Sequence, residues 1–145
     1  MDNNVGGLAT FTNSINNWIS RADDGFSDIV SGTVIKAANA IVDLSPVDTG
    51  RFKANWQITA NSPAQQSLND YDKSGNETKA SLARQARAVA NSSATKVIYI
   101  TNRLDYASGL EYGSSRQAPA GVLGVVNIRL GRYFEEAVAE ARSKR

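Results

Sequence analysis

The chain is 145 residues long, with 41% hydrophobic residues, 21% charged residues and a formal net charge of +2. This length and balance predict one globular domain that can bury its own core. Cysteine and histidine are both absent, which excludes disulfides, thiolate metal sites and the usual serine, cysteine and zinc hydrolases. We therefore expect no enzyme, no cofactor and no metal.

The start of the chain is expected to be flexible over residues 1–9 and helical afterwards. The first residues are polar and acidic, unlike a signal peptide, and no apolar run approaches the ~20 residues of a membrane span. The sequence thus predicts a protein made in the cytoplasm, without a membrane partner. Thr10 or Thr12 is a candidate cap for a first helix, and residues 23–25 then either break or kink the pattern.

Apolar residues recur at spacings of three and four from Phe26 to Leu44. This periodicity predicts a long amphipathic helix. Its apolar stripe could pack on a sheet or form a coiled-coil seam. Packing on a sheet is favoured, because the stripe is short and its neighbours are uncharged.

A turn and a strand are predicted after this helix. Pro46 disfavours helical backbone in the residue before it, Asp48 can accept bonds from backbone N–H groups, and Gly50 can take a positive φ. Residues 52–60 alternate between apolar and polar, which predicts a half-buried strand.

The polar segment 61–75 is interpreted as a long exposed loop or an extended arm. A loop of this length is uncommon in a compact domain unless it has a function. Ser74 and Glu77 have the spacing of a capping box, which predicts a helix over residues 76–91.

The same segment partly matches a calcium-binding loop. Asp70, Asp72, Ser74 and Gly75 fit its first six positions, but Ser81 occupies the twelfth, where the loop needs a bidentate carboxylate. A solvated loop is therefore favoured over a calcium site.

The second half of the chain continues with a strand over 96–101, which is rich in β-branched and aromatic residues. A short helix or turn over 104–112 and a loop over 113–121 should follow. A last helix is predicted over 122–141, ending in a basic tail at 142–145. The expected fold is a single α+β domain over residues 1–145. Its small antiparallel sheet is packed by the long N-terminal helix, the middle helix and the C-terminal helix.

Two pieces of the chain resemble a known family in combination. The first is Pro46-Val47-Asp48-Thr49-Gly50-Arg51 followed by Asn55-Trp56; the second contains Asn102, Tyr106-Ala107, Leu110-Glu111-Tyr112-Gly113 and Gln117-Ala118-Pro119-Ala120-Gly121. Together they resemble the neck proteins of tailed bacteriophages, the head–tail connector and tail-completion proteins, and they frame about half of the chain.

The resemblance implies a structural virion protein that forms a ring of six copies, or alternatively twelve, between head and tail. Its partners would be head-completion or adaptor proteins and tail-terminator or tail-tube proteins. It would be assembled in the host cytoplasm and end in the virion, with non-specific contact to channel DNA as a further option.

The resemblance also suggests roles for individual residues. Motif residues are assigned mainly to the fold, and exposed polar residues to a subunit interface. Arg51 and Glu111 are a candidate ion pair, and this structural pairing is favoured over acid–base catalysis by Asp48 and Glu111. The motif set is Pro46, Asp48, Thr49, Gly50, Arg51, Trp56, Tyr106, Glu111, Gly113 and Pro119; the interface set is Gln65, Gln66, Tyr71, Asp72, Arg116 and Gln117.

The basic second half of the chain supports an alternative of another class. Arginines and lysines there could meet nucleic-acid phosphates without reading sequence, although solvated faces explain the same residues. The alternative is a small nucleic-acid-binding or regulatory domain.

Overall fold

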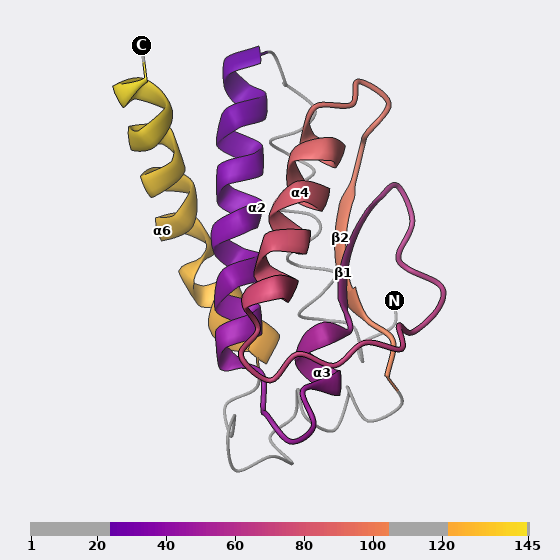
Figure 1. Cartoon of the computed structure of the whole chain (residues 1–145). Coiled ribbons are helices and arrows are strands. Elements are labelled where there is room, and N and C mark those ends of the chain that lie inside the picture. Colours follow the sequence, from indigo (N-terminus) through magenta and orange to yellow (C-terminus); the bar gives the residue numbers. More distant parts are fainter. Residues whose placement is uncertain (1–23, 105–121, 145) are drawn as a thin grey trace.

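The computed structural model describes residues 24–104 and 122–144 of the chain (Figure 1). Within these residues it has four helices and an antiparallel pair of strands, so the predicted α+β fold is confirmed. No helix of the described residues is both long and apolar enough to cross a bilayer. The elements in chain order are α2 (Asp24–Leu44), α3 (Arg51–Ala54), β1 (Trp56–Ala60), α4 (Asn76–Ala90), β2 (Ile98–Asn102) and α6 (Val122–Ser143).

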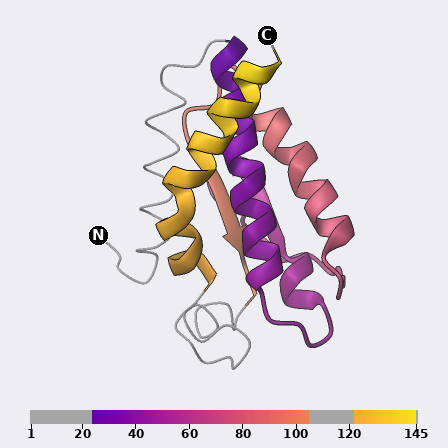
Figure 2. The same cartoon turned by 90° about the vertical axis from the view of Figure 1, so that its left-hand side faces the viewer.

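Helix α2 is the centre of the fold, with α6 packed on one side of it and α4 on the other (Figures 1 and 2). A Cβ atom placed on Gly32 would lie 3.2 Å from the Cβ of Ala137, so α2 and α6 cross at close range. Lys36 of α2 adds an ion pair to Glu140 of α6, with a nitrogen–oxygen distance of 2.8 Å. Asp43 of α2 pairs with Lys79 of α4.

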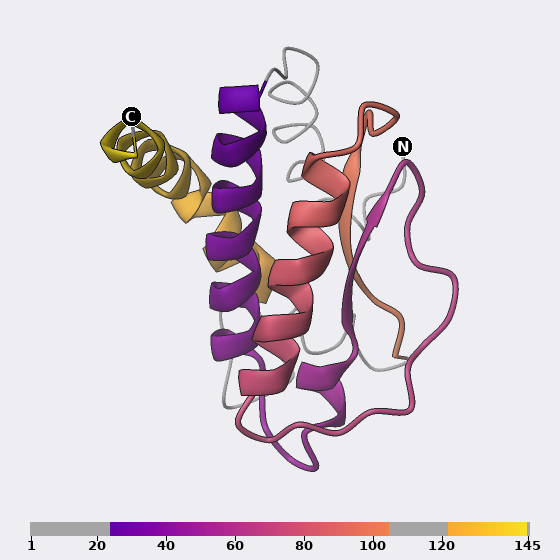
Figure 3. The same cartoon turned by 45° about the horizontal axis from the view of Figure 1, so that its top comes forward.

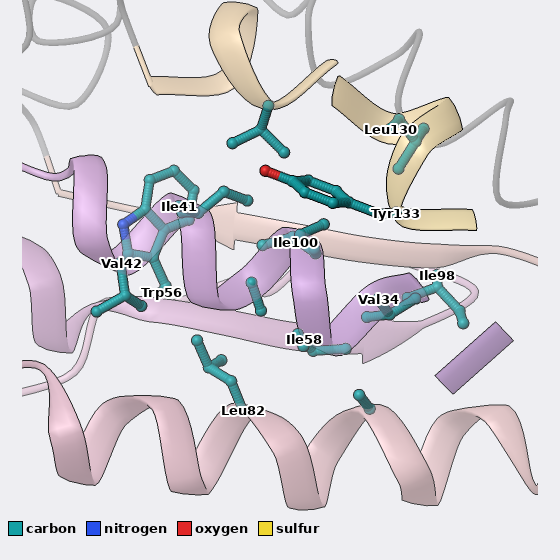
Figure 4. Close-up of a cluster of buried hydrophobic side chains, with 14 of the residues drawn as sticks. Val34, Ile41, Val42, Trp56, Ile58, Leu82, Ile98, Ile100, Leu130 and Tyr133 are labelled. Carbon is teal, nitrogen blue, oxygen red and sulfur yellow. The ribbon is translucent and has the colours of Figure 1, made fainter. Parts of the chain in front are cut away.

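The core explains the predicted apolar stripe of α2. Val30, Val34 and Ile41 are all at most 1% exposed. They pack with side chains from the sheet, from α4 and from α6, including Trp56, Ile58, Leu82, Ile98, Ile100, Leu130 and Tyr133 (Figure 4). The stripe is therefore a packing surface of one core and not a coiled-coil seam.

The sheet pairs Trp56 with Asn102, Ile58 with Ile100 and Ala60 with Ile98. Beyond the sheet, the backbone N–H of Ile58 donates to Oε1 of Gln85 on α4 at 2.8 Å. A helix side chain thus satisfies a donor on the outer edge of β1, which removes a site for unwanted strand pairing.

The predicted start of the first strand was wrong. Residues 51–54 form the short helix α3, and the strand begins at Trp56. The alternation of Phe52, Lys53, Ala54 and Asn55 had indicated a half-buried strand, but all four residues are buried. Alternation of apolar and polar residues indicates a strand only where one face is exposed, and here every side chain is covered. A single helical turn is also too short to show the helical period in the sequence.

The other predicted elements fit well where they can be compared. Helix α4 starts where it was expected, the second strand is shifted by two residues at its start, and α6 extends through the first residues of the predicted basic tail. The predictions for residues 1–9, for the first helix and for 105–121 lie outside the described residues.

Candidate functional site

The first motif of the resemblance forms a turn centred on Gly50. Its φ is +86°, in the left-handed region, and it precedes α3 directly. Its carbonyl oxygen accepts the N–H of Ala54 at 3.1 Å and the N–H of Asp72 at 3.0 Å. A Cβ on Gly50 would lie 2.5 Å from the backbone nitrogen of Lys73. The predicted positive φ is therefore present, and the glycine also gives room for the 61–75 segment.

Trp56 is fixed at the other end of the motif by a chain of hydrogen bonds. Its indole N–H donates to the Ser45 hydroxyl oxygen at 2.9 Å, and that hydroxyl donates to the carbonyl of Ile41 at 2.6 Å. The ring of Phe52 meets Trp56 edge to face, with centroids 5.6 Å apart. A buried indole needs such a partner, so this turn supports the core.

The 61–75 segment is held against this turn by side-chain hydrogen bonds. Asn55 is fully buried; its amide nitrogen donates to the carbonyl of Arg51 at 2.7 Å, and its amide oxygen accepts the N–H of Leu68 at 2.7 Å. Gln57 donates to the carbonyl of Gln66 at 2.7 Å. The segment is a loop, as predicted, but it is bound to the domain and does not form a free arm.

Asp72 caps the N-terminus of α4. The sequence had assigned this capping role to Ser74 and Glu77. Oδ2 of Asp72 accepts the N–H and the hydroxyl of Thr78 at 2.9 and 2.8 Å, and its Oδ1 accepts the N–H of Gly75 at 3.1 Å. Burial alone would raise the pKa of Asp72, but the bonds from Thr78, Gly75 and Ser74 outweigh burial and lower it below 3.8. The predicted capping box is therefore wrong. Gly75 takes a positive φ and lets a carboxylate from further back reach the first helical turn.

The capping role also bears on the partial calcium motif. Both oxygens of Asp72 are already accepting protein hydrogen bonds. Among the described residues, no group of three carboxylate, histidine or cysteine side chains could hold a metal ion. In the described structure, Asp72 therefore serves the start of α4.

A hollow of about 290 Å3 lies between the 61–75 segment and α4. Ala54, Trp56 and Leu68 contribute apolar surface to it. The other lining residues are polar or charged: Asp70, Tyr71, Asp72, Glu77, Thr78, Ser81, Arg84 and Gln85. Two residues of the predicted interface set, the exposed Tyr71 and the half-buried Asp72, line this hollow.

The predicted site residues separate into buried and exposed groups. Pro46, Gly50 and Trp56 are buried and Arg51 is half-buried, whereas Asp48 and Thr49 are exposed. Gln65, Gln66 and Tyr71 are exposed, and Asp72 is half-buried. Tyr106, Glu111, Gly113, Arg116, Gln117 and Pro119 lie outside the described residues.

The guanidinium group of Arg51 contains a buried nitrogen for which a hydrogen-bond partner is expected. Its Nε atom is buried and makes no hydrogen bond within the described part of the chain. Buried guanidinium groups are normally paired. The pairing of Arg51 with Glu111 stays a prediction.

Sequence reasoning missed Asn55 and Gln85, which join separate elements. Asn55 was expected on the polar face of a strand. Gln85 was expected on the inward face of the helix over 76–91, but no partner for its amide was predicted. Their partners, Leu68 and Ile58, are 13 and 27 residues away in the chain. No local pattern signals such contacts.

Comparison with known proteins gives no further assignment: no family model, curated protein or solved structure matches the chain.

Proposed function

We propose that this protein is a structural subunit of the neck of a tailed bacteriophage, where a ring of copies joins the head to the tail. The ring would have six copies, or alternatively twelve. The proposal starts from the two sequence pieces that together resemble neck proteins.

The observation that supports the proposal is the contact between the first piece and Asn102, the one residue of the second piece that the structure describes. Asn102, the first residue of the second piece, faces Trp56 of the first piece in the sheet register. Its side-chain amide donates to the carbonyl of Phe52 at 2.9 Å, and its oxygen accepts the N–H of Leu104 at 3.1 Å. Asn102 and the segment that carries the first piece therefore belong to one structural unit, as expected if the two pieces form a single family motif.

The distribution of the motif residues is consistent with a structural role. Gly50, Trp56 and Asn102 are each used in backbone geometry or hydrogen bonds that hold elements together. A protein that works by docking to copies of itself needs this kind of rigid frame more than it needs reactive groups.

The direct test removes the gene from the parent phage. We expect filled heads and finished tails to accumulate separately, and purified protein to restore joining. Infectious particles of normal yield without the protein would contradict the proposal.

A second candidate function, nucleic-acid binding, rests on a different observation. Lys36 of α2, Arg87 of α4 and Lys144, which directly follows α6, line one hollow of about 340 Å3. Glu140 neutralises Lys36 and, by its hydrogen bond, raises the pKa of that lysine above 10.5. Arg87 and Lys144 remain exposed and able to meet phosphates.

The two functions differ in their response to salt. Nucleic-acid binding predicts that affinity for duplex DNA falls steeply as salt increases, and falls again in Arg87→Ala. A neck subunit predicts assembly that depends on protein surfaces, and weak DNA binding with little effect of Arg87→Ala.

A further inference from the structure

Helix α6 exposes an aliphatic side chain that the fold does not use. Ile128 is 86% exposed, the highest value among the large hydrophobic residues that the structure describes as exposed. Covering such an apolar side chain with a partner surface is favourable. Arg129 follows it directly, Arg132 lies one helical turn further on, and both are exposed as well. We call these three residues, Ile128, Arg129 and Arg132, the α6 knob.

The charges of the α6 knob are largely free. Arg129 forms no ion pair with a described residue. Arg132 reaches Glu136 only at 3.9 Å, and its guanidinium carbon lies 5.7 Å from the ring centroid of Tyr133. Exposed pairs at that distance contribute little. The knob therefore offers an apolar centre with two available cations.

The hollow between the 61–75 segment and α4 has the complementary character. Leu68 and Trp56 give it an apolar part, while Asp70 and Glu77 are exposed carboxylates on its lining. Asp72 is already used by the start of α4. Arg84 is the cation among the lining residues, so two free carboxylates stand against one positive charge.

We infer that the α6 knob of one copy docks in this hollow of the next copy. The inference rests on the proposed ring and names the contact that would build it. Ile128 would cover the apolar part of the hollow, and Arg129 and Arg132 would meet Asp70 and Glu77. Tyr71, which is 57% exposed, would lose water at the edge of the contact.

The positions of the two surfaces fit a head-to-tail contact. Helix α6 and the 61–75 segment lie on opposite sides of the molecule (Figures 1 and 3), with α2 between α6 and α4. Each copy can therefore use its knob and its hollow at once, and such a head-to-tail contact builds a ring where the rotation between copies closes. A symmetric pairing of knob against knob would instead bring Arg129 and Arg132 of two copies together, which like charge disfavours.

Two variants separate the two halves of the contact. Ile128→Asp disables the knob and leaves the hollow, while Glu77→Arg disables the hollow and leaves the knob. Each should weaken assembly at least about tenfold and give monomers at concentrations where the wild type forms rings. Lys96→Glu changes an exposed charge elsewhere and should leave the rings intact. Circular dichroism checks that every variant is folded.

An equimolar mixture of the two variants decides the geometry of the contact. Only one intact junction can form in it, between the wild-type knob of Glu77→Arg and the wild-type hollow of Ile128→Asp. Mass photometry should therefore show a dimer and nothing larger. Rings in either single variant, or a mixture that stays monomeric, would overturn this contact.

The same measurement separates this inference from the proposed function. If the wild type forms rings that neither substitution weakens, the contact is wrong and the ring proposal survives. If the wild type stays monomeric at every concentration tested, the contact is wrong. The presence or absence of the protein in purified phage particles then decides the proposed function independently.

Discussion

At the residue scale, Gly50 carries the clearest structural requirement. It combines a positive φ with a backbone contact that leaves no room for a side chain. The positive φ of Gly50 could be predicted from the sequence, because a glycine after Pro46 and Asp48 is typical of a tight turn. Its contact with Asp72 and Lys73 could not, since those residues are more than twenty positions away.

We expect Gly50→Ala to lower the free energy of unfolding by at least about 2 kcal/mol, because left-handed backbone and a blocked Cβ position add together. The matched control is Gly131→Ala in α6, where a Cβ meets open space; alanine there should be neutral or stabilise by about 0.5–1 kcal/mol. Urea unfolding measures both. Equal effects of the two substitutions would show that Gly50 is not constrained.

Asp72 gives a prediction about pH. Its pKa is lowered in the folded protein, so its stabilising effect is present above the unfolded pKa and is lost as pH falls through the folded value. Asp72→Asn should cost about 1 kcal/mol near neutral pH, and the difference from wild type should shrink below pH 3.8.

Asp48→Asn is the control for this series, because Asp48 is exposed and no hydrogen bond to its carboxylate is seen in the described residues. It should change stability by less than about 0.5 kcal/mol. A loss in Asp72→Asn that stays constant down to the acid transition would exclude the charged cap.

At the element scale, the 61–75 segment depends on Asn55. Asn55→Ala removes two partly buried hydrogen bonds, to Arg51 and from Leu68, and should destabilise the domain by about 2 kcal/mol or more. Limited proteolysis should also cut between 65 and 70 faster than in the wild type.

Gln57→Ala is the comparison for that variant, because it removes an exposed bond to Gln66 in the same segment. Its effect should stay within about 1 kcal/mol. If Asn55→Ala and Gln57→Ala behave alike, the segment is not held by the buried amide.

The elements also show which features of the fold the sequence predicts. The apolar period of α2 runs for several turns and indicates its buried face without ambiguity, because each turn repeats the signal. Residues 51–55 have no such repetition, and Lys53 and Asn55 look exposed by chemistry although they are buried. The cap by Asp72 and the edge contact by Gln85 depend on tertiary structure, so a local pattern could not indicate them.

At the scale of the whole molecule, the proposed function requires a rigid subunit that acts through its surfaces and repeats around a ring. The close crossing of α2 and α6 at Gly32 and Ala137, and the fixed 61–75 segment, give such a subunit defined faces. Rigid faces allow the same contact to repeat around a ring.

The most direct measurement is cryo-electron microscopy of the neck of the parent phage particle. The account predicts a closed ring of six or twelve copies of this α+β domain between head and tail. A well-resolved neck in which every ring is built from other proteins would contradict it.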